Sequence, residues 1–254
     1  MGNRLADRVA IVTGAGRGLG EHIARAYCRE GAQVVLTARS NNEIQGVASD
    51  LSAEEGSALA VSGDVTDEAD VRAVFSRARA AFGPVDILVN NAGANQLKPF
   101  TETTVEEWDR ILTTNLRGAF LCVREALTDM VPNRSGAILN ISSGFGSRPF
   151  PNFTAYCASK FGLEGFTRSL AMEMEAEGIR VNTLHPGGVC DTTIGAATAP
   201  TDLPREQWLP ADILVEPAVF LASEEGRAVT GQCINAKGWP KGREAGVKPG
   251  DEAG

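Results

Sequence analysis

The sequence predicts a single α/β domain built on a doubly wound parallel sheet of about seven strands, with helices on both faces. Short runs of Val, Ile, Leu and Ala alternate with longer segments of helical periodicity, and continuous apolar runs are typical of strands covered on both faces. A glycine-rich turn follows the first run, and the 254 residues show no internal repeat. Strand–helix alternation also allows an eight-stranded barrel, but seven strands and the glycine-rich turn favour the open sheet.

The expected strands and helices follow one another along most of the chain. Helical periodicity predicts helices at about 19–30, 67–81, 104–130 and 154–177. The third helix opens with Thr103-x-x-Glu106, the spacing of a capping box. We expect residues 1–238 to form the domain and 239–254, which lack periodicity, to form a tail or arm outside its core. The expected strands are 8–13, 33–38, 58–62, 85–90, 137–142, 180–185 and 232–236.

Composition and charge exclude several classes of protein. The net charge is −8, from 24 Lys and Arg against 32 Asp and Glu, which argues against a protein that coats nucleic acid. The first ten residues hold no apolar segment typical of a signal peptide, and no apolar run approaches the roughly 18 residues of a membrane span. Two histidines and the absence of Cys-x-x-Cys argue against a metal site. We expect a cytoplasmic protein with reduced, mostly buried cysteines, namely Cys28, Cys122, Cys157, Cys190 and Cys233.

The turn after the first strand has the composition of a phosphate cradle. Glycines let the backbone turn sharply and approach a phosphate, and the N-terminus of the following helix offers free N–H groups. A tight turn without a ligand is the alternative, but the position between the first strand and the first helix favours the ligand. The turn reads Thr13-Gly14-Ala15-Gly16-Arg17-Gly18-Leu19-Gly20.

A second pattern points to acid–base chemistry. Tyr156 and Lys160 are four residues apart, so on a helix they share one face, and the ammonium should lower the pKa of the phenol. Such a phenol can donate a proton to a ketone oxygen or accept one from an alcohol. Ser143 lies thirteen residues upstream, at the end of the fifth expected strand. Asn115 lies on an apolar stripe of the third expected helix, where a buried asparagine could simply satisfy backbone groups.

Together these motifs resemble the short-chain dehydrogenase/reductase family, over roughly residues 5–238. The resemblance rests on T-G-x-x-x-G-x-G, the order of Asn115, Ser143 and Tyr156-x-x-x-Lys160, and Pro186-Gly187 after the sixth strand. It implies a Rossmann-like fold and hydride transfer to or from a nicotinamide cofactor. By resemblance, Tyr156 exchanges the proton, Ser143 polarises the substrate oxygen, Lys160 holds the cofactor ribose, and Asn115 holds a water that relays protons to Lys160.

The end of the second strand indicates which nicotinamide cofactor the chain binds. Ala38 stands where NAD-binding sites commonly carry a carboxylate, and Arg39 follows it. Arg39, with Arg17 of the glycine loop, would attract a 2′-phosphate, so we expect NADP(H), with NAD as the alternative. The family pattern has a threonine one position before Thr192, which leaves open whether Asp191 or Thr192 faces the cofactor. The resemblance extends the cofactor-binding set to Asp64, Val65, Asn91, Ala92, Gly93, Pro186, Gly187, Val189 and Thr192.

We therefore expect an oxidoreductase acting on a ketone or secondary alcohol, most simply a carbonyl reductase. The alternatives are an NAD(H)-linked alcohol dehydrogenase, a 3-oxoacyl thioester reductase and, in a different class, a non-catalytic nicotinamide sensor. The acidic stretch of Glu173, Glu175 and Glu177 with Asp129 argues against an acidic carrier-protein substrate. A homodimer or homotetramer is expected, with Phe161, Gly162, Gly165, Phe166 and Leu170 on the pairing face. The candidate substrate pocket comprises Asn95, Gln96, Phe145, Phe150, Phe153 and Gly188.

Overall fold

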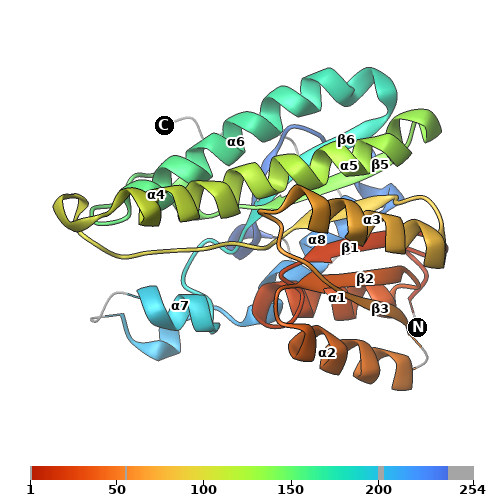
Figure 1. The fold of residues 1–254 in the computed structure, drawn as a ribbon, viewed down its shortest axis with the longest axis horizontal. Helices are drawn as coiled ribbons and strands as arrows, with labels where there is room; N and C mark the ends of the chain where they lie inside the picture. Colours follow the sequence, from red (N-terminus) through yellow and green to blue (C-terminus); the bar gives the residue numbers. More distant parts are fainter. Residues whose placement is uncertain (1, 55, 200–202, 240–254) are drawn as a thin grey trace.

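A seven-stranded sheet forms the centre of the molecule, with every neighbouring pair of strands parallel. The computed structural model describes residues 2–54, 56–199 and 203–239. In the strand order β3-β2-β1-β4-β5-β6-β7, the strand numbers fall as far as β1 and rise from β4 onward. This change in connection order confirms the predicted doubly wound sheet (Figure 1). The strands are β1 (Val9–Thr13), β2 (Gln33–Ala38), β3 (Ser57–Ser62), β4 (Ile87–Asn90), β5 (Gly136–Ile141), β6 (Ile179–His185) and β7 (Cys233–Asn235).

Helices cover both faces of the sheet and enclose two apolar cores. One core joins the sheet to α1, α2 and α8, and the other joins it to α3, α5 and α6 (Figure 1). Strand residues alternate between the two cores: Val12 packs into the first and Ile11 into the second. The helices are α1 (Gly18–Arg29), α2 (Asn41–Ala53), α3 (Glu68–Phe82), α4 (Val105–Leu112), α5 (Gly118–Asn133), α6 (Thr154–Met174), α7 (Thr193–Thr198) and α8 (Val215–Ala222).

Two of the core-covering helices were not predicted from the sequence. In α2 the buried residues Ile44, Val47, Ala48 and Leu51 follow helical spacing, so the signal is present, but serines, asparagines and a glycine surround it. The helix α8 is only eight residues long, carries Pro217 in its first turn and is apolar on most sides. A run of that length and composition does not distinguish a helix from a buried strand.

The predicted helix over 104–130 is interrupted in the structure. A π-helical turn (Thr113–Arg117) separates α4 from α5, and such turns occur frequently at functional sites. The predicted capping box is wrong by one residue, because Thr104 caps α4 and exchanges hydrogen bonds with Glu107. Residue 103 instead uses its hydroxyl to contact Pro99 O at 3.1 Å.

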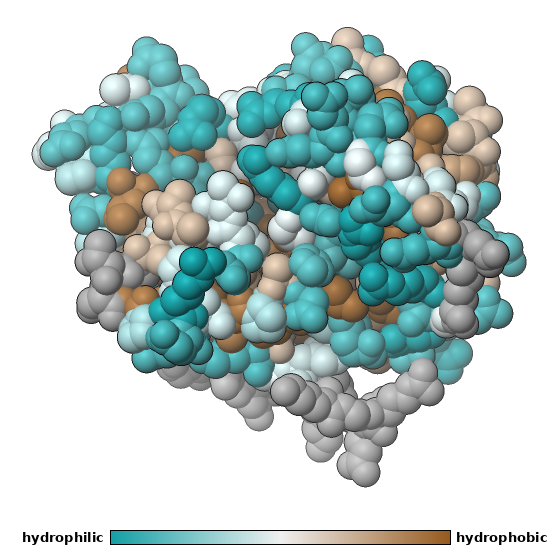
Figure 2. Space-filling view, turned by 90° about the horizontal axis from the view of Figure 1, so that it is seen from below, coloured by the Kyte–Doolittle hydropathy of each residue, from teal (hydrophilic) through white to brown (hydrophobic). Residues whose placement is uncertain are grey.

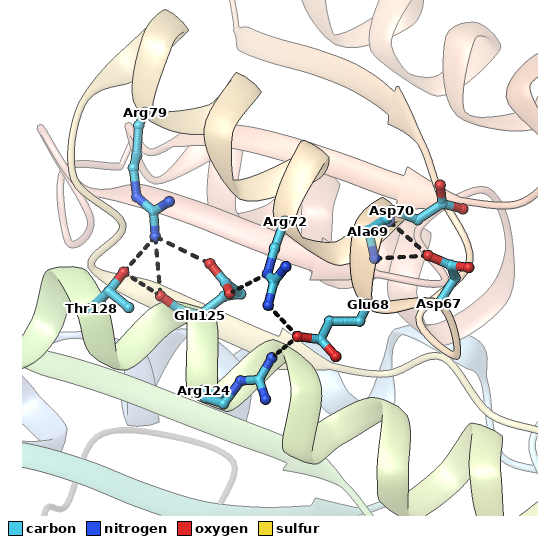
Figure 3. Close-up of polar contacts among 9 residues, drawn as sticks. All are labelled: Asp67, Glu68, Ala69, Asp70, Arg72, Arg79, Arg124, Glu125 and Thr128. Carbon is cyan, nitrogen blue, oxygen red and sulfur yellow. Dashed lines mark hydrogen bonds and ion pairs between the residues drawn. The ribbon is translucent and has the colours of Figure 1, made fainter.

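The helices α3 and α5 are joined by a network of ion pairs, shown in Figure 3. Glu68 accepts from both Arg72 and Arg124. Arg79 donates to Thr128 Oγ1 at 2.6 Å, and its Nε lies 2.9 Å from a carboxylate oxygen of Asp129. The acidic residue Asp129 is therefore neutralised by a neighbour rather than left as part of an uncompensated acidic surface.

The described residues form neither a helix that could span a membrane nor a cluster that could bind a metal ion. No described helix is both long and apolar enough to cross a bilayer. No group of three or more His, Cys, Asp or Glu residues in the described part of the chain is placed to hold a metal ion. On the face that Figure 2 shows, hydrophilic residues cover most of the area and hydrophobic ones appear in small groups. Four of the five cysteines are buried, and Cys233 is partly exposed.

The first residue after the predicted boundary at residue 238 packs against the domain. The ring of Trp239 packs edge-on against Phe220, with centroids 5.1 Å apart. The packed part of the chain thus includes at least one residue of the proposed tail. The remaining residues of that tail, 240–254, lie outside the described residues.

Candidate active site

The glycine-rich turn between β1 and α1 forms a tight loop. Gly14 and Gly18 have φ angles of +64° and +59°, a region that favours glycine. A Cβ at Gly20 would lie 2.3 Å from Nδ2 of Asn91, so only glycine allows the loop to approach the segment after β4. No side chain caps the first turn of α1, which leaves its N–H groups available to a phosphate.

The segment after β4 braces this loop. Asn91 Nδ2 donates to the carbonyl oxygens of Thr13 and Gly14 at 2.9 and 3.0 Å. The Thr13 hydroxyl is buried, donates to Val89 O, and accepts from the N–H groups of Asn91 and Ala92. Thr13 was predicted to bind the cofactor, but the structure uses its hydroxyl to join β1 to β4.

Asp64 and Val65 follow β3 along the same edge of the sheet. Asp64 Oδ1 accepts from the backbone N–H and hydroxyl of Thr66, at 2.9 and 2.8 Å. That carboxylate organises the turn, while Asp67 caps α3. Val65 packs against Gly118, where a Cβ would lie 3.0 Å from a Val65 methyl. The turn therefore places the Asp64 carboxylate at the cofactor edge and fixes its direction.

Two arginines lie where the adenosine end of a dinucleotide would be recognised. Arg39 follows β2, is exposed, and forms no ion pair with any described residue. Arg17 Nη1 lies 2.9 Å from Glu43 Oε1 in the first turn of α2. Sequence reasoning missed Glu43 because it did not predict α2. The carboxylate competes with any phosphate for Arg17 and leaves Arg39 as the uncompensated cation.

The helix α6 carries the predicted catalytic pair on one face. Lys160 is buried, and its Nζ lies 5.7 Å from the centre of the Tyr156 ring. Ser143 follows β5 by two residues, and its side chain acts on the Tyr156 phenol by lowering its pKa. Ser142 is buried and its hydroxyl has no partner among the described residues. The structure thus brings Ser143, rather than Ser142, to Tyr156.

The pKa values of this pair differ from the expectation. Burial raises the pKa of Tyr156 above its ordinary value, and the hydrogen bond from Ser143 opposes the rise only in part. The predicted lowering by Lys160 is therefore wrong for the protein without cofactor. Burial also lowers the pKa of Lys160 to about 8, while the Glu164 carboxylate opposes this fall. Lys160 Nζ donates to Ile141 O at 2.7 Å.

Asn115 lies in the π-helical turn, and both ends of its amide form hydrogen bonds. Oδ1 accepts from Ala94 N–H at 2.7 Å, and Nδ2 donates to Ala94 O and to Ser159 Oγ, both at 2.9 Å. Both Nδ2 hydrogens are used, and Oδ1 accepts one of the two hydrogen bonds for which it has lone pairs. The structure supports the bracing role, which joins the segment after β4 to α6.

An aromatic wall borders Tyr156. Phe145 stacks on Phe150 with centroids 5.2 Å apart and meets Phe153 edge-on at 4.8 Å. Phe145 also meets the Tyr156 ring edge-on at 6.1 Å. Phe153 is buried and Phe150 is half exposed. The three predicted phenylalanines thus gather next to the phenol, where Phe145 and Phe150 remain at least partly exposed.

The opposite wall comes from the segments after β4 and β6. Asn95 Nδ2 donates to Thr198 of α7 at 3.2 Å, and Gln96 Oε1 is buried without a partner among the described residues. Val189 O accepts from Leu209 N–H at 2.7 Å, and the same leucine covers Gly188. These contacts join α7 to the segment after β4 and the segment before α8 to the segment after β6.

Asp191 and Thr192 have different neighbours in the structure. Asp191 pairs with Arg205 at 2.7 Å, and both side chains are largely exposed. Thr192 caps α7, and its methyl would lie 3.3 Å from a Cβ at Gly18. Thr192 therefore faces the glycine loop, while Asp191 turns away from it. Gly187 supports the bend before them with a φ of +79°.

Comparisons with known proteins agree with this geometry. The family model for short chain dehydrogenases matches residues 8–202. The chain belongs to the short-chain dehydrogenase family. A 2,5-dichloro-2,5-cyclohexadiene-1,4-diol dehydrogenase of Sphingobium indicum is 36% identical, over 91% of this chain and 95% of that protein. A 3-oxoacyl-[acyl-carrier-protein] reductase of Staphylococcus aureus is 34% identical, over 90% of this chain and 96% of that protein.

Solved structures give the same result. One from Beutenbergia cavernae, described as an NAD(P)-dependent gluconate 5-dehydrogenase with bound NADP, has a TM-score of 0.85 at 37% identity. The match covers 93% of this chain and 97% of that one. Another, described as a gluconate dehydrogenase from Agrobacterium tumefaciens, has a TM-score of 0.86 at 32% identity, over 91% of this chain and 94% of that one.

The residues of this short-chain dehydrogenase fit a dinucleotide. Side chains in place of the glycines of the loop Gly14–Gly20 would occupy the space beside its backbone. The uncapped N-terminus of α1 lies at the end of this loop. After β5 and on α6, Ser143, Tyr156 and Lys160 lie beside the aromatic wall. This arrangement can bind a nicotinamide cofactor and exchange a proton with a substrate oxygen next to it.

Proposed function

We propose that the protein interconverts a ketone and a secondary alcohol with NADP(H), most simply as a carbonyl reductase. The observation that carries the proposal is the contact of the Tyr156 phenol with Ser143, one helical turn from a buried Lys160. A sensor that only bound a dinucleotide would have no need of a proton donor at this place. The family supports oxidoreductase chemistry, and the residues at the site add the reacting group.

Each residue has a role that follows from its position. Bound nicotinamide supplies or accepts the hydride. Tyr156, protonated because burial raises its pKa, donates its proton to the substrate oxygen during reduction. Ser143 donates a hydrogen bond to the same oxygen, where negative charge develops. Lys160 holds the ribose and, when protonated, stabilises the phenolate that Tyr156 leaves behind.

The proposed preference for NADP(H) rests on Arg39. It is an exposed cation without a described ionic partner at the end of β2, where a 2′-phosphate would lie. Arg17 contributes less than expected because Glu43 holds it. A weak discrimination against NAD(H) follows, since the site carries no carboxylate at Ala38 to select the free ribose hydroxyl.

The 3-oxoacyl thioester remains the second candidate substrate. The acidic surface that argues against a carrier protein is partly neutralised, because Asp129 pairs with Arg79 and Glu177 with Arg134. The similarity to a carrier-protein reductase adds support for this alternative. A thioester would place its 3-keto group at Tyr156 and extend its chain along the aromatic wall.

A substrate panel tests the proposed function. Purified protein is mixed with NADPH or NADH and a series of aliphatic, cyclic and aromatic ketones together with a 3-oxoacyl thioester, and loss of the reduced-nicotinamide absorbance is followed. We expect turnover of ketones with an apolar flank, faster with NADPH. Absence of turnover with every carbonyl, and with the matching alcohols and oxidised cofactors, would contradict the proposal.

A further inference from the structure

A carboxylate that the proposed chemistry does not use is buried one turn beyond Lys160. Glu164 is on α6 and is only 6% exposed, as is Lys160. Burying an ionised carboxylate is costly unless it is hydrogen-bonded or faces a cation. Glu164 forms no ion pair with any described residue, so the reason for its burial lies in its neighbours.

Both carboxylate oxygens of Glu164 accept a hydrogen bond. Thr183 Oγ1 of β6 donates to Oε2 at 2.8 Å, and Cys233 Sγ of β7 donates to Oε1 at 3.5 Å. Burial raises the pKa of the Cys233 thiol to about 11, so the thiol keeps the proton that it donates. Two donors directed at one carboxyl group match its ionised, acceptor-only form.

The titratable groups around Glu164 lie on three elements. Lys160 and Arg168 are on α6, one turn before and after it, and Arg168 is exposed. His185 of β6 is buried, its Nδ1 has no hydrogen-bond partner among the described residues, and burial lowers its pKa, so it is neutral near pH 7. Cys233 of β7 keeps its proton. Lys160 is therefore the buried cation one helical turn from this carboxylate, which raises the Lys160 pKa.

The approach of the loop after β5 keeps this group dry. A Cβ at Gly146 would lie 3.1 Å from Glu164 Cγ and 3.0 Å from Ser142 Oγ. With little water present, a charge one helical turn away acts through a low dielectric and has a strong effect. Lys160 is thus sensitive to Glu164 in a way that an exposed pair would not be.

We propose that Glu164 is a positioning residue of the active site, whose buried carboxylate is the counter-charge that keeps Lys160 protonated beside Tyr156. The inference rests on the proposed function for the role of Lys160. Glu164 itself touches neither substrate nor cofactor. It acts through Lys160, and the hydrogen bonds from Thr183 and Cys233 hold its carboxyl group in place.

The charge of Lys160 can be measured directly in the protein without cofactor. Lysines are labelled with ¹³C, the Lys160 resonance is assigned with Lys160→Arg, and its chemical shift is followed against pH. In the unsubstituted protein we expect a midpoint near pH 8. Because Glu164→Gln keeps the shape and removes the charge, it should lower that midpoint by about one pH unit or more. Lys98 and Lys237 serve as references in the same spectrum.

Three variants separate charge from structure. Glu173→Gln removes an exposed carboxylate from the same helix and should leave the Lys160 midpoint unchanged. Glu164→Asp keeps the charge and should leave the Lys160 midpoint closer to that of the unsubstituted protein than Glu164→Gln does. Cys233→Ala removes one donor at a partly exposed position and should lower the midpoint less than Glu164→Gln does, which keeps the test open if Glu164→Gln does not fold.

Two results would overturn the inference. The first is an unchanged Lys160 midpoint in the folded Gln variant, or in Cys233→Ala if only that variant folds. The second is an equal shift in Glu173→Gln. The titration needs no turnover, so it is independent of the proposed reaction. A shift without any carbonyl turnover would refute the proposed function alone, and turnover without a shift would refute only the role of Glu164.

Discussion

At the scale of single residues, the site separates groups that touch the substrate from groups that hold others in place. Tyr156 and Ser143 form the reacting end in the proposed function, and the Ser143 side chain acts on the pKa of the phenol. Thr13 and Asn115, which the sequence placed with the binding and catalytic residues, use their side chains to fix the segment after β4. The difference arises because a motif states which residue is present, while its hydrogen-bond partners decide its task.

The phenol gives the sharpest prediction at this scale. Tyr156→Phe removes the hydroxyl that exchanges the proton and should lower kcat by about 10²- to 10⁴-fold, with cofactor affinity largely retained. Turnover is measured by nicotinamide absorbance and affinity by cofactor fluorescence. The matched control is Tyr27→Phe. Tyr27 is buried, donates a hydrogen bond to Ala218 O, and lies far along the chain from Tyr156. Unchanged turnover in Tyr156→Phe would contradict the proposed role of Tyr156 in proton exchange.

Cofactor choice gives a second prediction from two charges of opposite sign. Arg39→Ala should lower the kcat/KM ratio of NADPH to NADH, because it removes the uncompensated cation. Glu43→Gln should raise that ratio, since it frees Arg17 for the phosphate. The Arg17–Glu43 pair is exposed and worth at most about 1 kcal/mol, so the gain is about fivefold or less. The reverse changes in the ratio would contradict the arrangement.

At the scale of elements, the interrupted helix before Ser143 shows how a local break positions the site. The π-helical turn between α4 and α5 holds Asn115 toward the segment after β4. Periodicity predicted one helix here because a single wide turn shifts the apolar stripe only slightly. The loops after β1, β4, β5 and β6 then meet at one edge of the sheet, as the parallel strand order requires.

The start of α4 provides a prediction that distinguishes neighbouring residues. Thr104→Ala should lower the free energy of unfolding by about 1 kcal/mol, because it removes the side chain that caps the helix. Thr103→Ala should cost clearly less, although the sequence spacing placed the capping box there. Thermal or urea unfolding of the two variants makes the comparison. A larger loss for Thr103→Ala would contradict the observed cap.

At the scale of the whole molecule, one face of the α4–α5–α6 layer exposes large apolar side chains. Phe120 and Phe161 are 45% and 44% exposed, and a groove beside Phe120 is lined by Leu116, Gly162 and Phe166. Leu170, expected on the same face, is instead buried in the core. The outward residues agree with the proposed homo-oligomer, whose pairing would cover this apolar area.

The size of the particle tests this proposal. Phe161→Glu puts a charge at the centre of the proposed contact and should shift the protein to a smaller species in light scattering after size exclusion. Ile194→Glu, at an exposed apolar residue of α7 and so outside the α4–α5–α6 layer, is the control for a surface charge. A monomeric unsubstituted protein, or equal behaviour of the two variants, would refute the proposed pairing face.

The sequence by itself determined the sheet, the phosphate loop and the Tyr156–Lys160 pair, because each depends on local periodicity or on residues a fixed distance apart on one element. Only the tertiary structure decided the rest. Three of its contacts join segments far apart in the chain. They are the ion pair of Glu43 with Arg17, the hydrogen bonds of Asn115, and the burial of Glu164 beside β6 and β7. A buried charge has an effect that depends on its neighbours and its exclusion from water, and neither is encoded in any short stretch of sequence.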